Sequence, residues 1–403
     1  MSGKLWVIVG GGISGLSLLW YLKRYRPEQK VVLLEKTARA GGVIYSSCKE
    51  GMSLQEGPKT FRMAEGEALL EMIVHVGLSD KLLIADKQER FIYYQKALRR
   101  LPSGPWGLAT TTLGRKLLKG IWQDMRRPSE GDEEESVASF MRRRFGDEVT
   151  RALVEPFILG TSGGDIETMS IKVWKELQLW EKDYGSVIKG FLRKKPQDSR
   201  LFNLEGGAFT LVKTLAQQLQ EAIVYEQGIN KIEPKGKELV LHTASDQWLV
   251  EKVFLTLPLV QMKTVAFPEA LEKDPFIKEA CAASFVGLHL WYKKNVLPVK
   301  GFGFLAPSCE NVPILGAIFD GEIFPSHGNL LTVMMGGMRQ GQVVEASNEE
   351  LVRQGLEGLR KCLKIEDSPQ GVHLVRYKEA LPQYPVGYFS RLEAFQKKLA
   401  KYP

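Results

Sequence analysis

The fold of this chain is decided by Leu5–Leu16, which has the sequence LWVIVGGGISGL. Its apolar first half predicts a buried parallel strand, and the glycines predict a turn into a helix that ends near Tyr25. The spacing Gly10-x-Gly12-x-x-Gly15 is typical of dinucleotide-binding turns. The first glycine permits the turn, the second leaves space for a pyrophosphate, and the third lets the helix pack close to the strand. The helix N-terminus offers N–H donors and a partial positive charge to the phosphates.

A second apolar run, Val31–Leu34, is followed by Glu35, 20 residues beyond Gly15. A carboxylate at this distance can accept a hydrogen bond from a ribose hydroxyl of the dinucleotide. The alternative is a glycine-rich loop in some other β-α-β unit, but the strand, helix, second strand and acid together favour a dinucleotide. The candidate contacts of this motif are Gly10, Gly11, Gly12, Ile13, Ser14, Gly15 and Glu35.

Composition limits the classes of function that the 403 residues can have. The length allows two or three domains with a large core. The net charge of +8 suits an acidic partner such as anionic lipid or a polycarboxylate ligand, whereas no nucleic-acid-binding module is recognisable, so no nucleic acid is expected. The four cysteines and five histidines are scattered, so we expect neither a metal site nor a disulfide framework.

The nucleotide strand begins at residue 5, so we expect no signal or transit peptide. No apolar run approaches the length of a membrane span. Together with the cysteine usage, this predicts a cytoplasmic protein that is either soluble or rests on a membrane face.

Hydrophobic patterns predict further elements along the chain. Helices are expected over 66–79, 136–145, 174–180, 209–220 and 349–363, strands over 90–94, 222–225, 253–258, 287–292, 313–319 and 329–335, and turns over 99–104 and 380–387.

The segment Arg99–Arg127 carries seven basic residues and a single acid, Asp124. Trp106, Trp122 and several large aliphatic residues are interleaved with them. A helix with cations on one side and apolar residues on the other is typical of a membrane-interface element. The alternative is a helix packed on its own domain with a solvated basic face, which periodicity alone slightly favours.

The residues after Glu35 indicate whether the dinucleotide is NAD or FAD. Lys36, Arg39, Gly41, Gly42 and Val43 resemble the extended fingerprint of the amine-oxidase-like FAD flavoproteins, and Gln55–Phe61 fits the same family. In that family the Gly-Gly turn passes under the flavin side of the cofactor, and the Gly-Pro segment lies beside the isoalloxazine ring. The resemblance implies noncovalent FAD, since no cysteine lies in a recognisable attachment motif. Further implied FAD contacts are Lys36, Arg39, Gly41, Gly42, Val43, Gly57, Pro58, Lys59, Thr60 and Ile229.

Over nearly its whole length the chain resembles one branch of that superfamily, the protoporphyrinogen oxidases of haem synthesis. The segments that carry this resemblance are the nucleotide fingerprint, Gly57-Pro58, Leu101–Gly104, Glu155-Pro156 with Gly160 and Gly164-Asp165, Tyr184–Ser186, Leu204–Gly207, Gly301–Leu305 and Leu381–Tyr384. The resemblance implies an α/β fold: a Rossmann-like FAD-binding domain, a mixed-sheet substrate domain and a helical membrane-binding insert. The implied parts are 1–62 and 201–262 for FAD, 63–96 and 263–385 for substrate, 97–200 for the insert, and 386–403 returning to the FAD domain.

The family reaction is the six-electron oxidation of protoporphyrinogen IX to protoporphyrin IX, with O₂ accepting the electrons. The flavin carries the chemistry, so no catalytic side chain or metal is nominated. Three alternatives stay open: oxidation of coproporphyrinogen III to coproporphyrin III, a flavin amine oxidase, and a flavin-binding protein without redox activity.

The resemblance also implies substrate contacts. Arg90 would bind a propionate, with Lys59 as a second carboxylate contact, and an arginine is the better bidentate partner. Gly160, Phe302, Leu305, Ile318 and Met334 would contact the tetrapyrrole ring. On the residues alone, Arg90 could equally be a surface arginine and the apolar residues plain core.

The resemblance favours the membrane-interface interpretation of Arg99–Arg127 over the packed-helix alternative, so we expect peripheral association with an anionic membrane surface. A homodimer is a further expectation. The family closes with a second, glycine-rich FAD segment, whereas this chain stops at Lys401-Tyr402-Pro403, so that segment is expected to be missing.

Overall fold

The computed structural model describes residues 4–85, 89–131, 134–195 and 197–402. Its internal contacts divide the chain into two compact units. The first unit consists of Met1–Ile84, Asp198–Ala280 and Ser390–Pro403, and the second of Ala85–Gln197 and Cys281–Phe389. The finer division into a nucleotide domain, a substrate domain and an insert over 97–200 stays a prediction.

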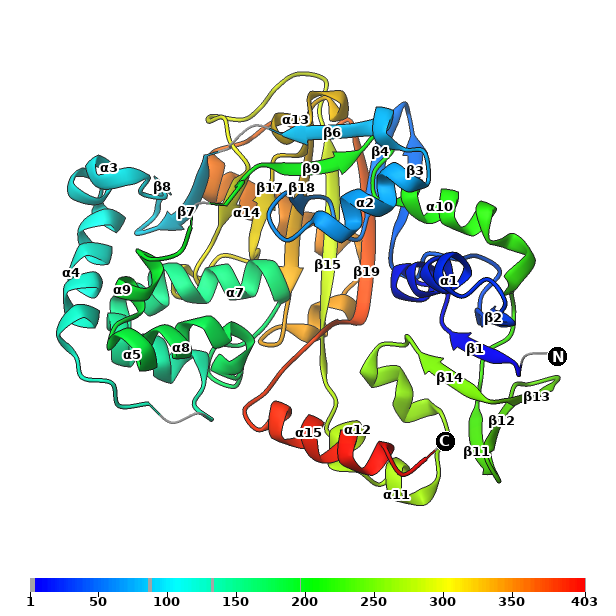
Figure 1. The fold of residues 1–403 in the computed structure, drawn as a ribbon. Helices are drawn as coiled ribbons and strands as arrows, with labels where there is room; N and C mark the ends of the chain where they lie inside the picture. The colour runs from blue at the N-terminus through cyan, green and yellow to red at the C-terminus, as the bar shows by residue number, and fades with distance from the viewer. Residues whose placement is uncertain (1–3, 86–88, 132–133, 196, 403) are drawn as a thin grey trace. The chain divides into compact units, whose positions relative to one another are not determined.

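A four-stranded parallel sheet lies at the centre of the first unit, in the order β10-β2-β1-β14 (Figure 1). β1 (Trp6–Val9) leads through the glycine turn into α1 (Ile13–Tyr25) and then β2 (Val31–Leu34), as the sequence predicts. β10 (Ile223–Val224) and β14 (Lys252–Leu255) come from much later in the chain. Because all four strands are parallel, their carboxyl ends meet at one edge, where the glycine turn begins.

The remaining elements of the first unit surround this sheet. The strands are β3 (Tyr45–Lys49), β4 (Met52–Glu56), β5 (Phe61–Arg62), β6 (Leu82–Ala85), β9 (Leu201–Leu204), β11 (Lys231–Lys235), β12 (Glu238–His242) and β13 (Gln247–Val250). The helices are α2 (Glu67–His75), α10 (Phe209–Gln218), α11 (Glu269–Glu272), α12 (Pro275–Lys278) and most of α15 (Tyr388–Leu399). Buried side chains of α1, α2 and α10 form one core with β1 and β2.

A mixed seven-stranded sheet forms the second unit's core, in the order β19-β15-β18-β17-β16-β7-β8. Among the described strand pairs of this sheet, β16 and β7 run parallel and the others antiparallel. The strands are β7 (Arg90–Tyr94), β8 (Ala97–Arg100), β15 (Ala282–Trp291), β16 (Gly303–Leu305), β17 (Gly316–Ile318), β18 (Leu330–Gly336) and β19 (Gly371–Pro382). This confirms an α/β fold with a mixed sheet.

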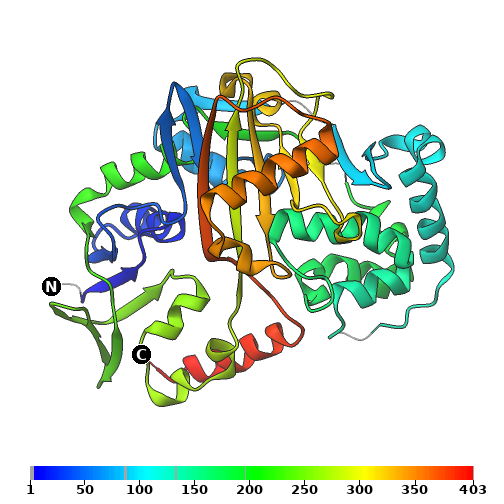
Figure 2. The same ribbon diagram turned by 180° about the vertical axis from the view of Figure 1, so that it is seen from behind.

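The long helix α14 (Asn348–Leu363) lies across one face of this sheet (Figure 2). Its buried Leu351, Leu359 and Leu363 share a core with Leu288 and Val333 of the sheet. Side chains alternate between the two faces of a strand. One face is therefore committed to the core under α14, and on the other face Ile92 and Leu305 pack with Leu113 and Ala152 of the helical segment.

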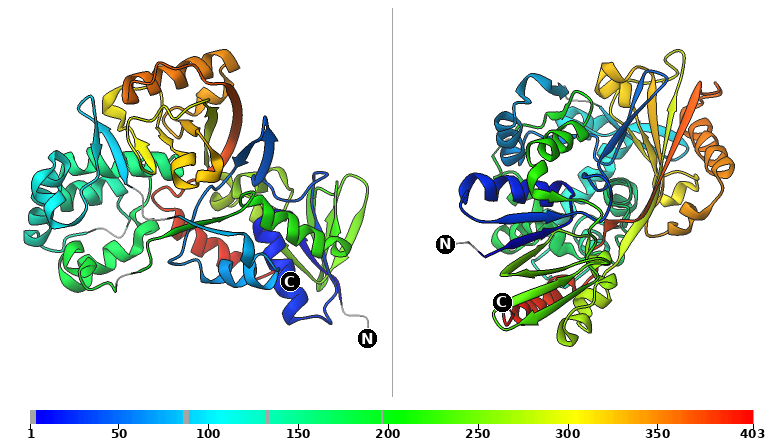
Figure 3. Two further views of the ribbon diagram at one scale, coloured as in Figure 1. Left: turned by 90° about the horizontal axis from the view of Figure 1, so that it is seen from above. Right: turned by 90° about the vertical axis from the view of Figure 1, so that its right-hand side faces the viewer.

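Helices of the segment that follows β8 gather beside the sheet of the second unit (Figure 3). They are α3 (Gly104–Thr110), α4 (Thr112–Arg126), α5 (Val137–Phe145), α6 (Asp147–Val149), α7 (Glu155–Ser162), α8 (Lys175–Tyr184) and α9 (Val187–Phe191). They have a core of their own, centred on Val137, Phe140, Ile158 and Ile171. α13 (Asp320–Ile323) follows β17.

Two sequence predictions differ from the structure. Arg99 and Arg100 lie in β8, paired with β7, and not in a turn. The expected turn over 380–387 contains the end of the twelve-residue strand β19, which the sequence pattern does not predict. β19 is an edge strand whose residues are mostly half-exposed, so it lacks a marked apolar pattern and owes its conformation to pairing with β15. α15 was also missed.

No helix in the described part of the chain combines the length and the apolar character needed to cross a membrane.

Candidate functional site

The glycine turn has the backbone geometry that the motif requires. Gly10 has φ +110°, a region that L side chains rarely adopt. A Cβ on Gly15 would lie 2.0 Å from the Gly10 carbonyl oxygen, so α1 packs against the turn more closely than any side chain permits. A Cβ on Gly12 would meet no atom within 4 Å, which leaves open space above the turn. The three glycines thus serve three different physical needs.

The first turn of α1 faces this space with unused donors. The first hydrogen bond inside the helix runs from Leu16 N–H to the Gly12 carbonyl, at 3.0 Å. The N–H groups of Ile13, Ser14 and Gly15 therefore have no acceptor within the helix. Since α1 has 13 residues, its dipole adds a partial positive charge at this end. Such a site suits a phosphate group.

Thr256 fixes the turn from the neighbouring strand. Its hydroxyl lies 2.9 Å from the Val9 carbonyl and 3.0 Å from the Gly10 carbonyl. Sequence reasoning missed this residue. The available signal was its position directly after β14, because polar residues at the carboxyl end of a parallel strand reach the site.

Glu35 is 7% exposed and already carries three hydrogen bonds from the protein. Gly11 N–H donates to Oε2 at 2.7 Å, and the Thr37 N–H and hydroxyl donate to Oε1 at 2.9 and 2.7 Å. A carboxylate has about four acceptor positions, so Oε2 can still take one ribose hydroxyl. The negative charge of Glu35 also reaches Tyr225, whose pKa is raised mainly by burial and further by this charge.

The Gly41-Gly42 loop lies against the glycine turn. Gly41 N–H donates to the Gly11 carbonyl at 2.8 Å, and a Cβ on Gly42 would lie 3.6 Å from the Gly12 Cα. The Arg39 guanidinium donates to the Gly42 carbonyl at 3.1 Å and lies 4.7 Å from the centre of the Tyr45 ring. Arg39 therefore stabilises the loop itself.

The other predicted cofactor residues continue from this loop. Val43 is exposed, and a Cβ on Gly57 (φ +89°) would lie 3.0 Å from its carbonyl oxygen. Pro58, Lys59 and Thr60 follow Gly57 directly.

Lys36 and Ile229 lie near the other end of the motif. Lys36 follows Glu35, and a Cβ on Gly228 would lie 3.0 Å from the Lys36 Cβ. Ile229 packs on the core beneath the parallel sheet. The first unit thus brings all the predicted cofactor residues into one structure. The open space at Gly12, the donors of α1 and the acceptor on Glu35 fit a bound dinucleotide.

The predicted ring contacts share one face of the mixed sheet. In the register, Gly303 of β16 is opposite Arg90 and Ile318, and Gly316 is opposite Leu305 and Met334. Residues opposite one another on neighbouring strands point to the same face. This is the face away from α14, because Phe91, Phe304 and Val333, which alternate with them, lie in the core under that helix.

Two contacts join the remaining residues to this face. The Arg90 guanidinium lies 5.2 Å from the centre of the Phe302 ring, and Arg90 is exposed. A Cβ on Gly160 would lie 2.1 Å from Leu305 Cδ2, so α7 packs directly on that side chain. Leu305, Ile318 and Met334 are half-buried, which suits the wall of an apolar site. Lys59 belongs to the first unit and the other predicted substrate residues to the second.

Comparison with known proteins gives one consistent result. The sequence matches the family described as flavin containing amine oxidoreductase over residues 13–401. It is 30% identical to a protoporphyrinogen oxidase of Schizosaccharomyces pombe, covering 98% of this chain and 91% of that protein. It is 29% identical to the protoporphyrinogen oxidase of Bos taurus, covering 99% and 92%.

Solved structures agree with this result. A crystal structure from Exiguobacterium sp. 255-15, described as a candidate protoporphyrinogen oxidase, matches with a TM-score of 0.87 and 25% identity, covering 100% of this chain and 93% of that one. Cyclohexylamine oxidase from Brevibacterium oxydans has a TM-score of 0.73 at 15% identity, with coverage of 98% and 90%, which shows a shared fold.

Proposed function

We infer, from the fact that this chain belongs to the family of flavin containing amine oxidoreductases, that it is an FAD-dependent oxidoreductase. We propose that it oxidises protoporphyrinogen IX to protoporphyrin IX. The observation that carries this proposal is the identity of about 30% to protoporphyrinogen oxidases over nearly the whole chain. The coverage includes both the cofactor residues of the first unit and the ring contacts of the second.

FAD would bind in a Rossmann-like manner on the first unit. The N–H groups at the start of α1 would hold the pyrophosphate, Glu35 a ribose hydroxyl, and the segments at Gly42 and Gly57 the flavin side. The geometry at Gly12 and Glu35 supports this placement. A side chain at position 12 would block the pyrophosphate, and a Glu35 carboxylate with all its acceptor positions occupied by protein donors could not bind the ribose.

The substrate's properties determine what the second unit must supply. Protoporphyrinogen is an apolar ring with two propionates, so it needs apolar walls and a cation. Arg90 offers the cation, held beside Phe302, and Leu305, Ile318 and Met334 offer the walls on the same sheet face. When bound, FAD supplies the electron-accepting group, and the protein's own task is to orient the ring and exclude water. O₂ is the proposed final acceptor.

Anaerobic mixing of the FAD-loaded protein with protoporphyrinogen IX tests this function. We expect the flavin absorption to bleach first, because FAD accepts two electrons from the substrate. When O₂ is admitted, the flavin colour should return and porphyrin fluorescence should appear, because the six-electron oxidation needs three such cycles. Parallel samples receive coproporphyrinogen III or a primary amine. Faster bleaching with either of those, or no bleaching with any substrate, would overturn the proposal.

A peripheral contact with an anionic membrane is proposed for α4. One side of this helix exposes Arg115, Leu118, Lys119, Trp122, Met125 and Arg126, which we call the basic–apolar face. With 3.6 residues per turn, the cations of α4 lie on one side of the helix and Leu113, Leu117 and Ile121 on the other, as the sequence predicts. Leu118, Trp122 and Met125, next to the cations, are exposed as well. Leu113 and the glycines of α4 pack inward, so part of the apolar set is left outside among the cations. Trp106 of α3 is also 80% exposed.

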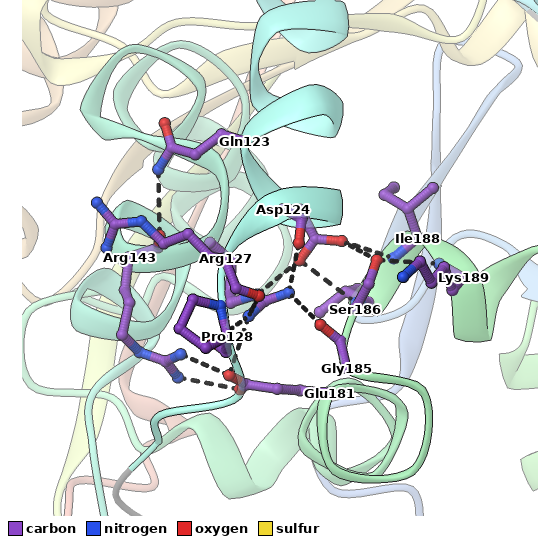
Figure 4. Close-up of polar contacts among 12 residues, drawn as sticks. Gln123, Asp124, Arg127, Pro128, Arg143, Glu181, Gly185, Ser186, Ile188 and Lys189 are labelled. Carbon is purple, nitrogen blue, oxygen red and sulfur yellow. Dashed lines mark hydrogen bonds and ion pairs between the residues drawn. The ribbon is translucent and has the colours of Figure 1, made fainter.

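The charges of α4 support this proposal. Asp124, the single acid of the Arg99–Arg127 segment, is fully buried, where Arg144 donates to it at 2.6 Å and Ile188 N–H at 3.0 Å. Figure 4 shows Asp124 pointing toward Ser186 and Ile188, in a polar cluster that also includes Glu181. The outward side of the helix is therefore left with cations. Lys116 is the exception, since it pairs with Glu148.

Location and assembly are further proposals. A membrane-face enzyme with reduced cysteines suits the cytoplasm, and separation of cell extracts into soluble and membrane fractions tests this. A homodimer is tested by light scattering of the purified protein.

A further inference from the structure

Asn203 of β9 is a buried residue that the proposed function does not yet use. It has no exposed surface, and its side-chain nitrogen donates to the Lys59 carbonyl at 2.7 Å and to Gln55 Oε1 at 2.9 Å. Its side-chain oxygen accepts from Leu204 N–H at 2.8 Å. Both protons of the amide are thus directed at oxygen atoms of the first unit. Such a buried network resists rearrangement, because each broken bond leaves an unsatisfied polar group.

The partner Gln55 is itself held in place. It is 4% exposed, and a Cβ on Gly207 would lie 2.6 Å from its Cδ. A side chain at position 207 would therefore displace Gln55. This gives Gly207 a physical role: it makes room for the amide that pairs with Asn203.

The hydrogen bond from Asn203 fixes the direction of one peptide group. The described residues contain no cis peptide bond, and in a trans peptide the carbonyl and the following N–H point in opposite directions. Because the Lys59 carbonyl points to Asn203, the Thr60 N–H points away from the buried amides. Thr60 is half-buried, and its N–H makes no hydrogen bond to any residue that the structure describes.

The segment that carries this donor is connected to the glycine turn by close backbone contacts. Gly57 packs on Val43, and the adjacent Gly42 packs on Gly12, so the chain of contacts runs within the first unit from the start of α1 to the Gly57–Thr60 segment. A ligand that extends from the phosphate donors along this chain of contacts comes next to Gly57–Thr60.

We propose that Asn203 is a positioning residue that turns the Lys59–Thr60 peptide so that Thr60 N–H donates a hydrogen bond to the flavin ring of bound FAD. This rests on the proposed binding of FAD to the first unit. An N–H donor at the ring stabilises its electron-rich reduced form more than its oxidised form, so the same bond would raise the midpoint potential.

Two variants of one residue isolate this donor. Thr60→Pro removes the N–H, and its matched control Thr60→Ala removes the side-chain hydroxyl but keeps the N–H. Proline requires a negative φ, and the φ of Thr60 is not positive, so the sign of this angle permits the substitution. We expect Thr60→Pro to raise the FAD dissociation constant about three- to tenfold over Thr60→Ala, as the loss of one hydrogen bond implies. We also expect an altered flavin absorption band and a lower midpoint potential.

Asn203→Leu tests the positioning residue itself and should change the flavin band and potential as Thr60→Pro does. Gln55→Met leaves the bond from Asn203 to Lys59 and should change them less. If Asn203→Leu folds and lowers thermal stability without changing the flavin band or potential, its role is structural and the proposal is wrong. If it fails to fold, the two Thr60 variants decide, and equal affinity, band and potential in that pair would also overturn the proposal.

The proposed function fails separately. An unaltered chain that binds FAD but oxidises no porphyrinogen overturns the function and leaves this inference standing, since every readout here uses FAD alone. An unaltered chain that binds no FAD overturns both.

Discussion

Glu35 supports the glycine turn and also faces the cofactor. Glu35→Ala should weaken FAD binding by about 1–3 kcal/mol, because it removes a charged acceptor and leaves Gly11 N–H without its partner. Titration of the flavin-free protein with FAD measures this. Thr37→Ala is the control, since it removes one donor to Oε1 but leaves the carboxylate. Equal FAD affinity in the Glu35 variant would remove this residue from the ribose site.

Arg90 is expected to bind a propionate at a distance from the reacting carbon. Arg90→Ala should therefore raise KM for protoporphyrinogen more than it lowers kcat. Arg90→Lys should recover part of the loss, because lysine keeps the charge but not the planar fork of donors. Steady-state kinetics distinguish the cases. A variant with unchanged KM and reduced kcat would place Arg90 in another role.

Single residues also show where sequence reasoning stops. Gly10 and Glu35 were predictable because backbone geometry and motif spacing determine their roles. Thr256 and Asn203 were not, because their partners are far away in sequence and appear only when strands pair. A threonine or asparagine is common enough that its identity alone carries no signal.

At the scale of helices, Asp124 joins α4 to α5 and α9. Its carboxylate accepts hydrogen bonds from the Arg144 guanidinium of α5 and from the N–H of Ile188 in α9. The side chains of Asp124 and Arg144 are both fully buried. Asp124→Ala should destabilise the fold by about 3–5 kcal/mol, because it removes one of the two carboxylates that pair with the buried Arg144, and the other, Glu181, is shared with Arg143. Denaturant unfolding measures the loss. Glu350→Ala, which breaks the exposed pair with Arg353, should cost far less.

The basic–apolar face makes a prediction for α4 as a whole. Each cation near an anionic surface contributes on the order of 1 kcal/mol, and this falls off within a Debye length. Changing Arg115, Lys119 and Arg126 to glutamate should abolish the salt-sensitive part of binding to anionic vesicles. Co-sedimentation at low and high salt measures it. Lys116 is left unchanged because it pairs with Glu148.

The control variant has the same change in net charge, made by replacing the exposed Lys237, Lys293 and Lys300 with glutamate. The control protein should bind vesicles like the parent. Residual binding through Trp106 and Trp122 should survive high salt. If the α4 variant binds as well as its control, the helix is simply a packed element with a solvated face.

Helices and strands were predictable where their own sequence has a strong apolar periodicity. β1, α1, β2 and α14 have strong apolar periodicity and were found within a residue or so. The two-sided character of α4 was predictable, but periodicity could not show that glycines and a buried aspartate, instead of the largest apolar residues, make part of the inward contact. β19 depends on its neighbour, which a local pattern does not contain.

For the whole molecule, the cofactor should be released without breaking a covalent bond. None of the four cysteines forms a disulfide. Cys362 is buried, and its pKa is raised to about 12 chiefly by that burial, so it is a poor nucleophile for a flavin linkage. Acid precipitation should leave the yellow chromophore in the supernatant, measured by absorbance. Flavin that stays with the pellet would contradict this.

The interleaving of the two units has a consequence for how the protein is made. The first unit begins with β1, but its sheet needs β14, since Trp6 pairs with Lys252, and its last segment is Ser390–Pro403. During synthesis both outer edges of the β1–β2 pair therefore stay unpaired until β10 and β14 have left the ribosome. Such long-range closure is slow and exposes apolar surface meanwhile. Chaperone supply during translation, more than the stability of the finished fold, should then limit the yield of active protein.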